Sequence, residues 1–165
     1  STVLDDYSRY IISWKLCTTM TAGDVTDTLD LALAASGCDS ATVLHMPRLL
    51  SDNGPSYVAG ELAAYIEAQS MSHVRGAPFH PQTQGKIERW HQTLKNRILL
   101  ENYYLPGDLE AFIEHYNHQR YHESLGNVTP ADAYFGRDRQ IHAQRAAIKK
   151  QTIEHRRLQH RKLAA

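Results

Sequence analysis

The chain has 165 residues and a mass of 18.7 kDa, which is the size of one compact domain. Hydrophobic residues make up 42% and charged residues 22% of the sequence, which excludes a collagen-like, low-complexity or disordered chain. The longest uninterrupted apolar stretch, residues 31–35, is far shorter than the ~20 residues of a membrane span, and no signal segment opens the chain. The sequence therefore predicts a cytoplasmic protein with no membrane partner.

The two cysteines, Cys17 and Cys38, are too few for a disulfide scaffold and lack the spacing of metal ligands. We expect both to be buried thiols in a reducing compartment.

A formal net charge of zero conceals two oppositely charged parts. Residues 1–136 carry 9 Lys+Arg and 16 Asp+Glu, a net charge of −7, whereas residues 137–165 carry 9 and 2, a net charge of +7. A basic block of this kind usually contacts phosphate or an acidic partner, and a solvated helix is the alternative. We divide the chain into a core, residues 1–136, and a basic tail, residues 137–165, which is predicted to be helical because residues 140–163 contain no Gly or Pro.

Strand-forming and helix-forming patterns alternate from the first residue. Residues 1–16 are rich in Val, Ile, Tyr and Trp around a turn-forming segment at 5–9, which predicts a hairpin. A helix is predicted next, capped by Asp24 and ended by Gly37. Its apolar residues recur at every fourth position: Val25, Leu29 and Leu33.

A short apolar strand within residues 43–51 runs into the sequence Ser-Asp-Asn-Gly-Pro, where Asn-Gly and Pro force a turn. Asp52 is therefore expected at the C-terminal end of a strand. A helix around Leu62 and Ile66 and a strand near residues 73–75 follow. This order predicts a layered α/β fold, in which sites gather beyond the carboxyl ends of the strands.

A loop at 77–85, with two prolines and a glycine, precedes a strongly amphipathic helix. Trp90 belongs to its apolar face and is predicted to be a core residue. Two further helices are expected, one capped by Asp108 and one opened by Thr-Pro-Ala-Asp at 129–132. The amphipathic helix carries an apolar stripe of Ile87, Trp90, Leu94 and Ile98, and a neighbouring polar face of Glu88, His91, Gln92 and Lys95.

Two acidic residues lie in distinctive surroundings. Asp52 follows Leu-Leu-Ser and precedes Asn-Gly-Pro, and Glu88 lies in His-Pro-Gln-Thr-Gln-Gly-Lys-Ile-Glu-Arg. Taken alone, Asp52 can be a turn former, and Glu88 an acid favoured by the helix dipole. The combination of the two surroundings is hard to reach by chance.

With these motifs the chain resembles the integrase-like (DDE) catalytic core of bacterial insertion-sequence transposases, relatives of retroviral integrases. The resemblance implies an α/β fold of the ribonuclease H-like type, an α/β/α arrangement with a mixed sheet and additional C-terminal helices. It covers nearly the whole chain, through LDDYSR at 4–9, SDNGP at 51–55, HPQTQGKIE at 80–88, YNHQRYH at 116–122 and TPAD at 129–132.

The resemblance implies a triad of two Asp and one Glu that holds two divalent cations, Mg²⁺ or Mn²⁺, for phosphodiester cleavage and strand transfer. Hard cations favour carboxylate oxygens, and two of them can stabilise both the attacking and the leaving oxygen. Asp52 and Glu88 match the second and third acids. Asn53 and Gly54 would shape the turn beside Asp52.

The partners implied are DNA, as element ends and target, and further copies of the chain, with a nucleoid-associated protein when DNA is bound. Lys95 matches a position that contacts DNA in the family. Lys86, Arg89 and His91 are further candidate DNA-binding residues.

The first acid of the triad has no counterpart in this pattern. In the family it lies on the strand before the hairpin, whereas Asp5 and Asp6 match the turn after the second strand. We assign them to that turn, and replacement of the missing ligand is the alternative. The sequence thus predicts an N-terminally truncated core, without its first strand, that has little or no strand-transfer activity by itself.

Other functions stay open at this point. The chain can be a non-catalytic fragment that binds DNA or intact transposase, as an inhibitor or inert remnant, or a nuclease that cuts without joining. His115, His118 and His122 have offsets of three and seven, which can suit a metal site, but we favour a solvated or aromatic-packed face.

Overall fold

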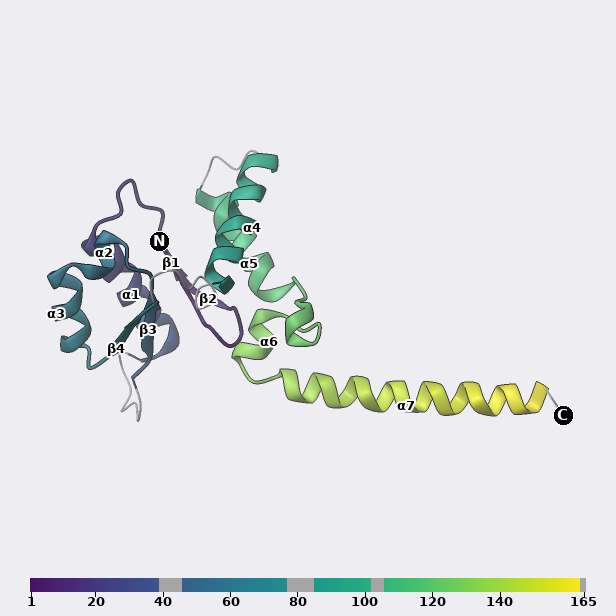
Figure 1. The fold of residues 1–165 in the computed structure, drawn as a ribbon. Coiled ribbons are helices and arrows are strands. Elements are labelled where there is room, and N and C mark those ends of the chain that lie inside the picture. The colour runs from purple at the N-terminus through teal and green to yellow at the C-terminus, as the bar shows by residue number, and fades with distance from the viewer. Residues whose placement is uncertain (39–45, 77–84, 102–105, 164–165) are drawn as a thin grey trace.

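Short strands and longer helices alternate along the chain in the computed structural model, which describes residues 1–38, 46–76, 85–101 and 106–163 (Figure 1). The fold is mixed α/β, as the sequence predicts. The elements are β1 (Thr2–Leu4), β2 (Ile11–Trp14), α1 (Ala22–Ser36), β3 (Arg48–Ser51), α2 (Pro55–Val58), α3 (Gly60–Ala68), β4 (Ser72–Arg75), α4 (Gly85–Glu101), α5 (Pro106–His118), the 3₁₀ helix η2 (Glu123–Leu125), α6 (Pro130–Tyr134) and α7 (Asp138–Leu163).

The N-terminal hairpin forms as predicted. Strands β1 and β2 are antiparallel, and Val3 lies opposite Ser13. In the connecting turn, the Asp5 carboxylate accepts hydrogen bonds from the backbone N–H of Ser8 at 2.7 Å and from its hydroxyl at 2.6 Å. Arg9 has a φ of 65°, in the left-handed region. The predicted turn role of Asp5 is therefore confirmed.

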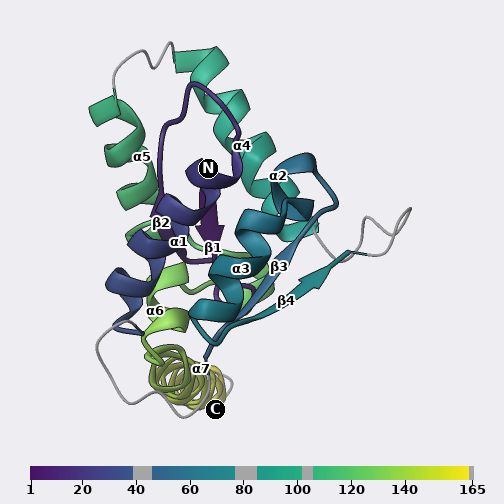
Figure 2. The same ribbon diagram turned by 90° about the vertical axis from the view of Figure 1, so that its left-hand side faces the viewer.

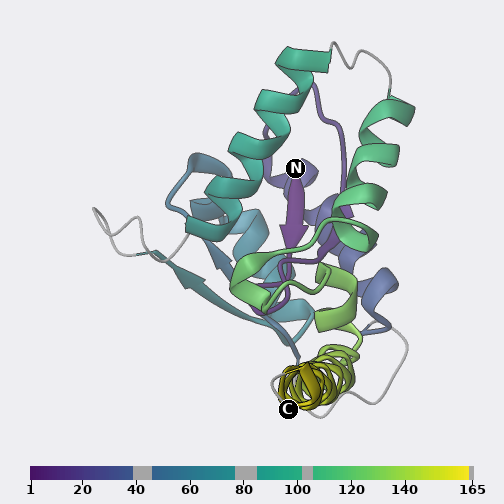
Figure 3. The same cartoon turned by 90° about the vertical axis from the view of Figure 1, so that its right-hand side faces the viewer.

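Helices cover the strands on two sides. Helices α1 and α3 form one layer, and its buried apolar residues pack against Val3 of β1 and Leu49 of β3 (Figure 2). Helices α4 and α5 lie against the other face of the hairpin, where Leu4 and Trp14 meet Trp90 and its neighbours (Figure 3). The predicted α/β/α layering and the core position of Trp90 are confirmed.

The strands form two separate sheets in the part of the chain that the structure describes. Strand β1 pairs only with β2, whereas β3 and β4 form a parallel pair with Arg48 opposite Ser72. The expected mixed sheet is therefore divided. Both strand directions occur, but no ladder of hydrogen bonds joins β1 to β3.

Several local predictions differ from the structure. The N-cap of α1 is Thr21 rather than Asp24, because the two residues form a capping box in which Asp24 is the third helical residue. Helix α5 begins at Pro106, so Asp108 is its third residue rather than the residue before its start. Cys17 and Cys38 are half-buried rather than buried, because each lies just beyond the end of an element, near the surface.

Helix α7 extends away from the rest of the molecule (Figure 1), and none of its residues is buried. Arg145, near the start of the helix, donates a hydrogen bond to the Asn127 carbonyl at 2.8 Å. This contact attaches α7 to the loop between η2 and α6. Residues 138–163 thus form one long helix that packs little against the rest of the chain. Over the described ranges, with their gaps, no helix combines the length and the apolar character needed to cross a bilayer.

One buried side chain connects α5 to the N-terminal hairpin. Asn117, 4% exposed on α5, accepts a hydrogen bond from the Ile11 N–H at 2.9 Å and donates to the Ile11 carbonyl at 3.0 Å. The Asn117 side-chain amide thus forms the two hydrogen bonds that a neighbouring strand would form with Ile11 of β2. Both backbone groups would otherwise be buried without a partner, which is costly.

Replacing Asn117 by Ala should lower the free energy of unfolding by about 2–4 kcal/mol, because it leaves the two Ile11 backbone groups unpaired in the core. Urea unfolding followed by circular dichroism measures this loss. Asn96→Ala, on the exposed face of α4, is the matched control and should change stability by less than about 0.5 kcal/mol. Equal effects of the two substitutions would contradict the role given to Asn117.

Candidate metal and nucleic-acid site

Asp52 is exposed directly after β3, where the sequence predicts it. Its Oδ1 accepts the Gly54 N–H at 2.8 Å, and Oδ2 has no hydrogen bond to the described residues. Asn53 fastens the same turn to the end of β4, because its Nδ2 donates to the Gly76 carbonyl at 2.8 Å. The carboxylate is thus held through one oxygen and offers the other to solvent.

Because Gly54 has no side chain, there is room beside it for the Asp52 carboxylate. A Cβ at Gly54 would lie 2.9 Å from Asp52 Oδ1, closer than carbon and oxygen approach without displacement. The φ of Gly54 is −59°, which any residue can adopt, so the constraint is one of space rather than of backbone conformation. Nearby, burial and then the charge of Asp52 raise the pKa of Tyr57.

Glu88 lies in the first turn of α4 and is exposed. Ile87, Trp90 and Leu94 turn toward the core, so the helical period directs Glu88 outward. In Figures 2 and 3 the N-terminal end of α4 lies at the same end of the β3–β4 pair as the C-terminal end of β3. The fold therefore brings the segments that carry Asp52 and Glu88 to one end of the sheet.

The donor chemistry at this end suits a hard divalent cation, because Asp52 and Glu88 both present carboxylate oxygens. The early acids are engaged elsewhere. Asp5 accepts from Ser8, and Asp6 Oδ1 lies 3.0 Å from Lys86 Nζ. Among the residues that the structure describes, no group of three His, Cys, Asp or Glu side chains could hold a metal ion.

The candidate DNA-binding residues divide between two surroundings. His91 and Lys95 lie on the face of α4 that carries Glu88, and the pKa of His91 is lowered by burial and then by the N-terminal amino group and Lys95. Lys86 and Arg89 instead line a cavity on another side of α4. Lys86 donates to the Asp6 backbone carbonyl and pairs with the Asp6 carboxylate, which neutralises part of its charge.

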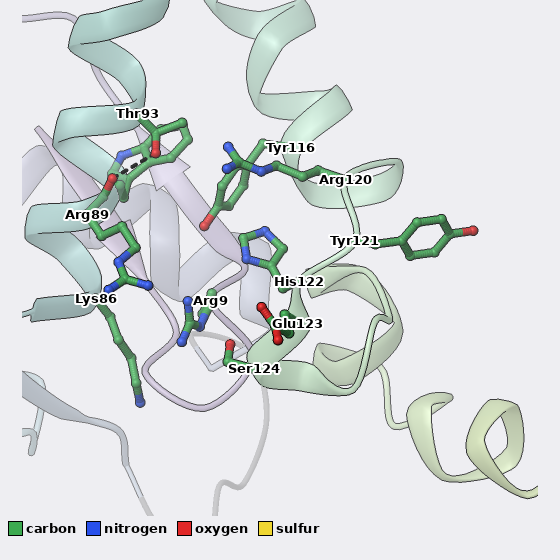
Figure 4. Close-up of a pocket in the computed structure, with 11 residues that line it drawn as sticks. Arg9, Lys86, Arg89, Thr93, Tyr116, Arg120, Tyr121, His122, Glu123 and Ser124 are labelled. Atoms are coloured by element: carbon green, nitrogen blue, oxygen red, sulfur yellow. Dashed lines mark hydrogen bonds between the residues drawn. The ribbon is translucent and has the colours of Figure 1, made fainter.

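This cavity has a volume of about 520 Å³ and lies between α4 and the segment that follows α5 (Figure 4). Sequence reasoning did not assign a site to Arg9, Arg120 or His122, which also line it. A signal was present, because Arg120 and His122 belong to the YNHQRYH motif. Their gathering around Arg89 depends on the packing of α4 against α5.

The imidazole of His122 is held in its neutral form. Burial, followed by the charges of Arg120 and Arg9, lowers the pKa of His122 to about 4. Its ring packs edge-on against Tyr116, with centroids 5.0 Å apart. Helix α5 ends at His118, so His115, His118 and His122 do not share one helix face, and the expected aromatic packing is found for His122.

Family models described as integrase core domains match residues 1–81 and 69–130. The Pol polyprotein of equine infectious anemia virus (strain Wyoming) is 30% identical over 113 residues, which is 63% of this chain and 10% of the polyprotein. Together the two matches make residues 1–130 similar to integrase core domains, and we refer to this part of the chain as the integrase-like core. The chain spans a tenth or less of the first retroviral polyproteins that it matches, at 3% and 10% of their lengths.

Solved structures place the integrase-like core in the ribonuclease H-like fold. The crystal structure of the catalytic core domain of BIV integrase superposes with a TM-score of 0.58 at 23% identity, over 86% of this chain and 88% of that one. A chain of the simian T-cell lymphotropic virus intasome, in complex with a PP2A regulatory subunit, gives 0.64 at 20% identity, over 79% and 46%. The predicted fold class is confirmed.

The integrase-like core should lose stability as the pH falls from about 6.5 to about 4. His122 is neutral when folded but gains a proton in this window when unfolded, so the unfolded state binds more protons. We expect a contribution of about 1–2 kcal/mol, because solvent screens a half-buried group. Urea unfolding at a series of pH values measures it.

His122→Gln should flatten this part of the pH profile, whereas His155→Gln, on exposed α7, should leave it unchanged. Carboxylates such as Asp24 and Asp132 also lose stabilising contacts in acid, so the difference between the variants isolates His122. Parallel profiles for the wild type and His122→Gln would refute the assignment.

Proposed function

We propose that this integrase-like core takes part in metal-dependent cleavage and joining of DNA, with Asp52 and Glu88 as its catalytic acids. The observation that carries the proposal is the Asp52 carboxylate, held by the Gly54 N–H with one oxygen free, at the same end of the sheet as the first turn of α4. Two hard-donor carboxylates on separate rigid elements suit a cation better than isolated surface acids do.

Integrase core domains use divalent metals, and we propose Mg²⁺ or Mn²⁺, with two ions in the complete site. When bound, such ions polarise the phosphodiester and activate the attacking hydroxyl or water. Asp52 and Glu88 would hold them, and the Asn53–Gly76 contact would keep the Asp52 turn in place. Phosphoryl transfer then needs mainly positioning and neutralisation of charge.

The described residues offer two of the three acids that the integrase-like pattern implies. Asp5 is committed to its turn and Asp6 to Lys86. We therefore propose that the third carboxylate comes from outside the described residues, and that the 165-residue chain alone joins DNA poorly. The same observation favours a second candidate function, a non-catalytic module that binds DNA or another copy of the enzyme.

We propose that residues 137–165 act as a DNA-contacting tail attached to the core of residues 1–136. Helix α7 has no buried residue and is strongly basic, and its cations can neutralise phosphates without sequence preference. Lys95, on the face of α4 that carries Glu88, would contact the backbone near the acids. The likeness to an intasome chain supports assembly into oligomers on DNA, and the sequence motifs support an insertion-sequence origin.

Metal binding tests the acids directly. Isothermal titration of the chain with Mn²⁺ should show weak binding that Asp52→Asn and Glu88→Gln each reduce about tenfold or more, because each substitution removes one of the two oxygen ligands. Asp30→Asn, an exposed acid on α1, is the control. Binding that survives both substitutions would place the metal elsewhere.

Joining is tested on labelled duplex DNA with free 3′-hydroxyl ends. The chain alone should give little product, and a chain extended by an aspartate-bearing strand before Ser1 should give metal-dependent product. If the chain alone joins DNA and Asp52→Asn abolishes this, Asp5, Asp6 or a second copy completes the site.

Gly54→Ala should weaken Mn²⁺ binding several-fold while leaving the fold intact, because the added methyl displaces the Asp52 carboxylate but not the backbone. Gly60→Ala is the matched control, since a Cβ there meets nothing within 4 Å. Titration calorimetry and thermal unfolding separate the two effects. Unchanged metal affinity in Gly54→Ala would show that the position of Asp52 does not matter.

A further inference from the structure

Three guanidinium groups gather at the cavity of about 520 Å³ and have no carboxylate partner among the residues that the structure describes. Arg9, Arg89 and Arg120 line it, and none of them forms an ion pair with a described residue. Arg120 lies over the Tyr116 ring, 5.6 Å from its centroid. Glu123 is the one carboxylate among the lining residues, so the cavity is strongly positive.

The same cavity is lined by two residues with buried polar atoms that lack a partner. Trp90 is 1% exposed, and its indole Nε1 has no hydrogen bond within the described part of the chain. His122 Nε2 is likewise buried without a partner there. An indole N–H can only donate, so its missing partner is an acceptor. Buried donors without partners are rare in folded proteins and point to an absent ligand.

The side chains converge on one space. In Figure 4 the Tyr116 hydroxyl, the His122 ring and the guanidinium groups of Arg9 and Arg89 face a common region, whereas Tyr121 points away from it. They come from the hairpin turn, α4, α5 and the segment after α5. Elements far apart in the sequence thus supply cations and donors to one point.

We propose that this cavity binds backbone phosphates of DNA, separately from the acids Asp52 and Glu88. Guanidinium groups form paired hydrogen bonds with phosphate oxygens, and a phosphate accepts from donors on several sides, as this arrangement requires. The inference rests on the proposed function only in naming DNA as the source of the phosphate. It assigns Arg9, Arg120 and His122, which no catalytic role explains.

A second cavity favours a phosphate chain over a single ion. It has a volume of about 490 Å³ and shares Arg9, Lys86 and Ser124 with the first. At the start of α7 it is lined by Asp138 and His142. The two cavities therefore adjoin. A DNA strand that leaves the arginine cavity by this path arrives at the basic helix.

The first measurement uses inorganic phosphate and the full chain in ¹⁵N NMR without metal. Phosphate should shift the indole N–H signal of Trp90 and leave that of Trp14, which is not among the lining residues, unchanged. Arg89→Gln with Arg120→Gln should abolish the shift. A Trp90 signal that phosphate does not move would overturn the proposal.

The second measurement is the affinity for a labelled DNA duplex of about 20 base pairs at a series of salt concentrations, again without metal. The double variant should bind about tenfold or more weakly and lower the salt slope by about 2, because two phosphate contacts are lost. Arg48→Gln, an exposed arginine at the start of β3, is the control. An equal loss in Arg48→Gln would reduce the effect to general charge and overturn the proposal.

Competition experiments identify the class of molecule that supplies the ligand. RNA or an acidic peptide that displaces phosphate from Trp90 at lower concentration than DNA would overturn the assignment to DNA. Thermal unfolding checks each variant, and Arg120→Lys, which keeps the charge but not the paired geometry, should show an intermediate loss if Arg120→Gln fails to fold. Because these experiments require neither metal nor DNA joining, their outcomes do not depend on the catalytic roles proposed for Asp52 and Glu88.

Discussion

The arrangement of this molecule depends on the contact between Asn117 and the backbone of Ile11. Two hydrogen bonds across 106 residues of sequence hold α5 against the hairpin, and the aromatic core of Trp90, Phe112 and Tyr116 packs beside them. Because the hairpin is short, it needs this attachment to keep its register. Helix α5, the segment after it and the hairpin turn take their relative positions from the same contact.

Both sites of the integrase-like core follow from this layering. Helix α4 carries Glu88 on its exposed side and contributes Arg89 and Trp90 to the cavity on another side, so one rigid helix serves a carboxylate site and a cationic site. Opposite charges so close would neutralise each other on a flexible surface. On this helix the carboxylate proposed to hold metal and the arginine proposed to bind phosphate lie on different sides.

Charge is distributed unevenly along the molecule. Residues 1–136 carry a net charge of −7 and residues 137–165 a net charge of +7, and the arginine cavity on the core is lined by four cationic side chains and one carboxylate. Arg145 joins the start of α7 to the loop after η2, so the basic helix leaves the core at the end of the cavities.

The sequence by itself determined the hairpin, the helices with clear apolar periods, the turn at Asp52 and the ribonuclease H-like class, because these depend on local patterns and on motifs contiguous in the chain. It misplaced the cap of α1, where Thr21 and Asp24 bond each other reciprocally and either could be taken for the cap from the sequence, and it expected one sheet where the strands form two. Only the tertiary structure decided that Arg9, Arg89, Arg120 and His122 share a cavity, and that Asp6 neutralises Lys86. Such contacts join residues from separate elements, and no local period or spacing encodes the packing that brings them together.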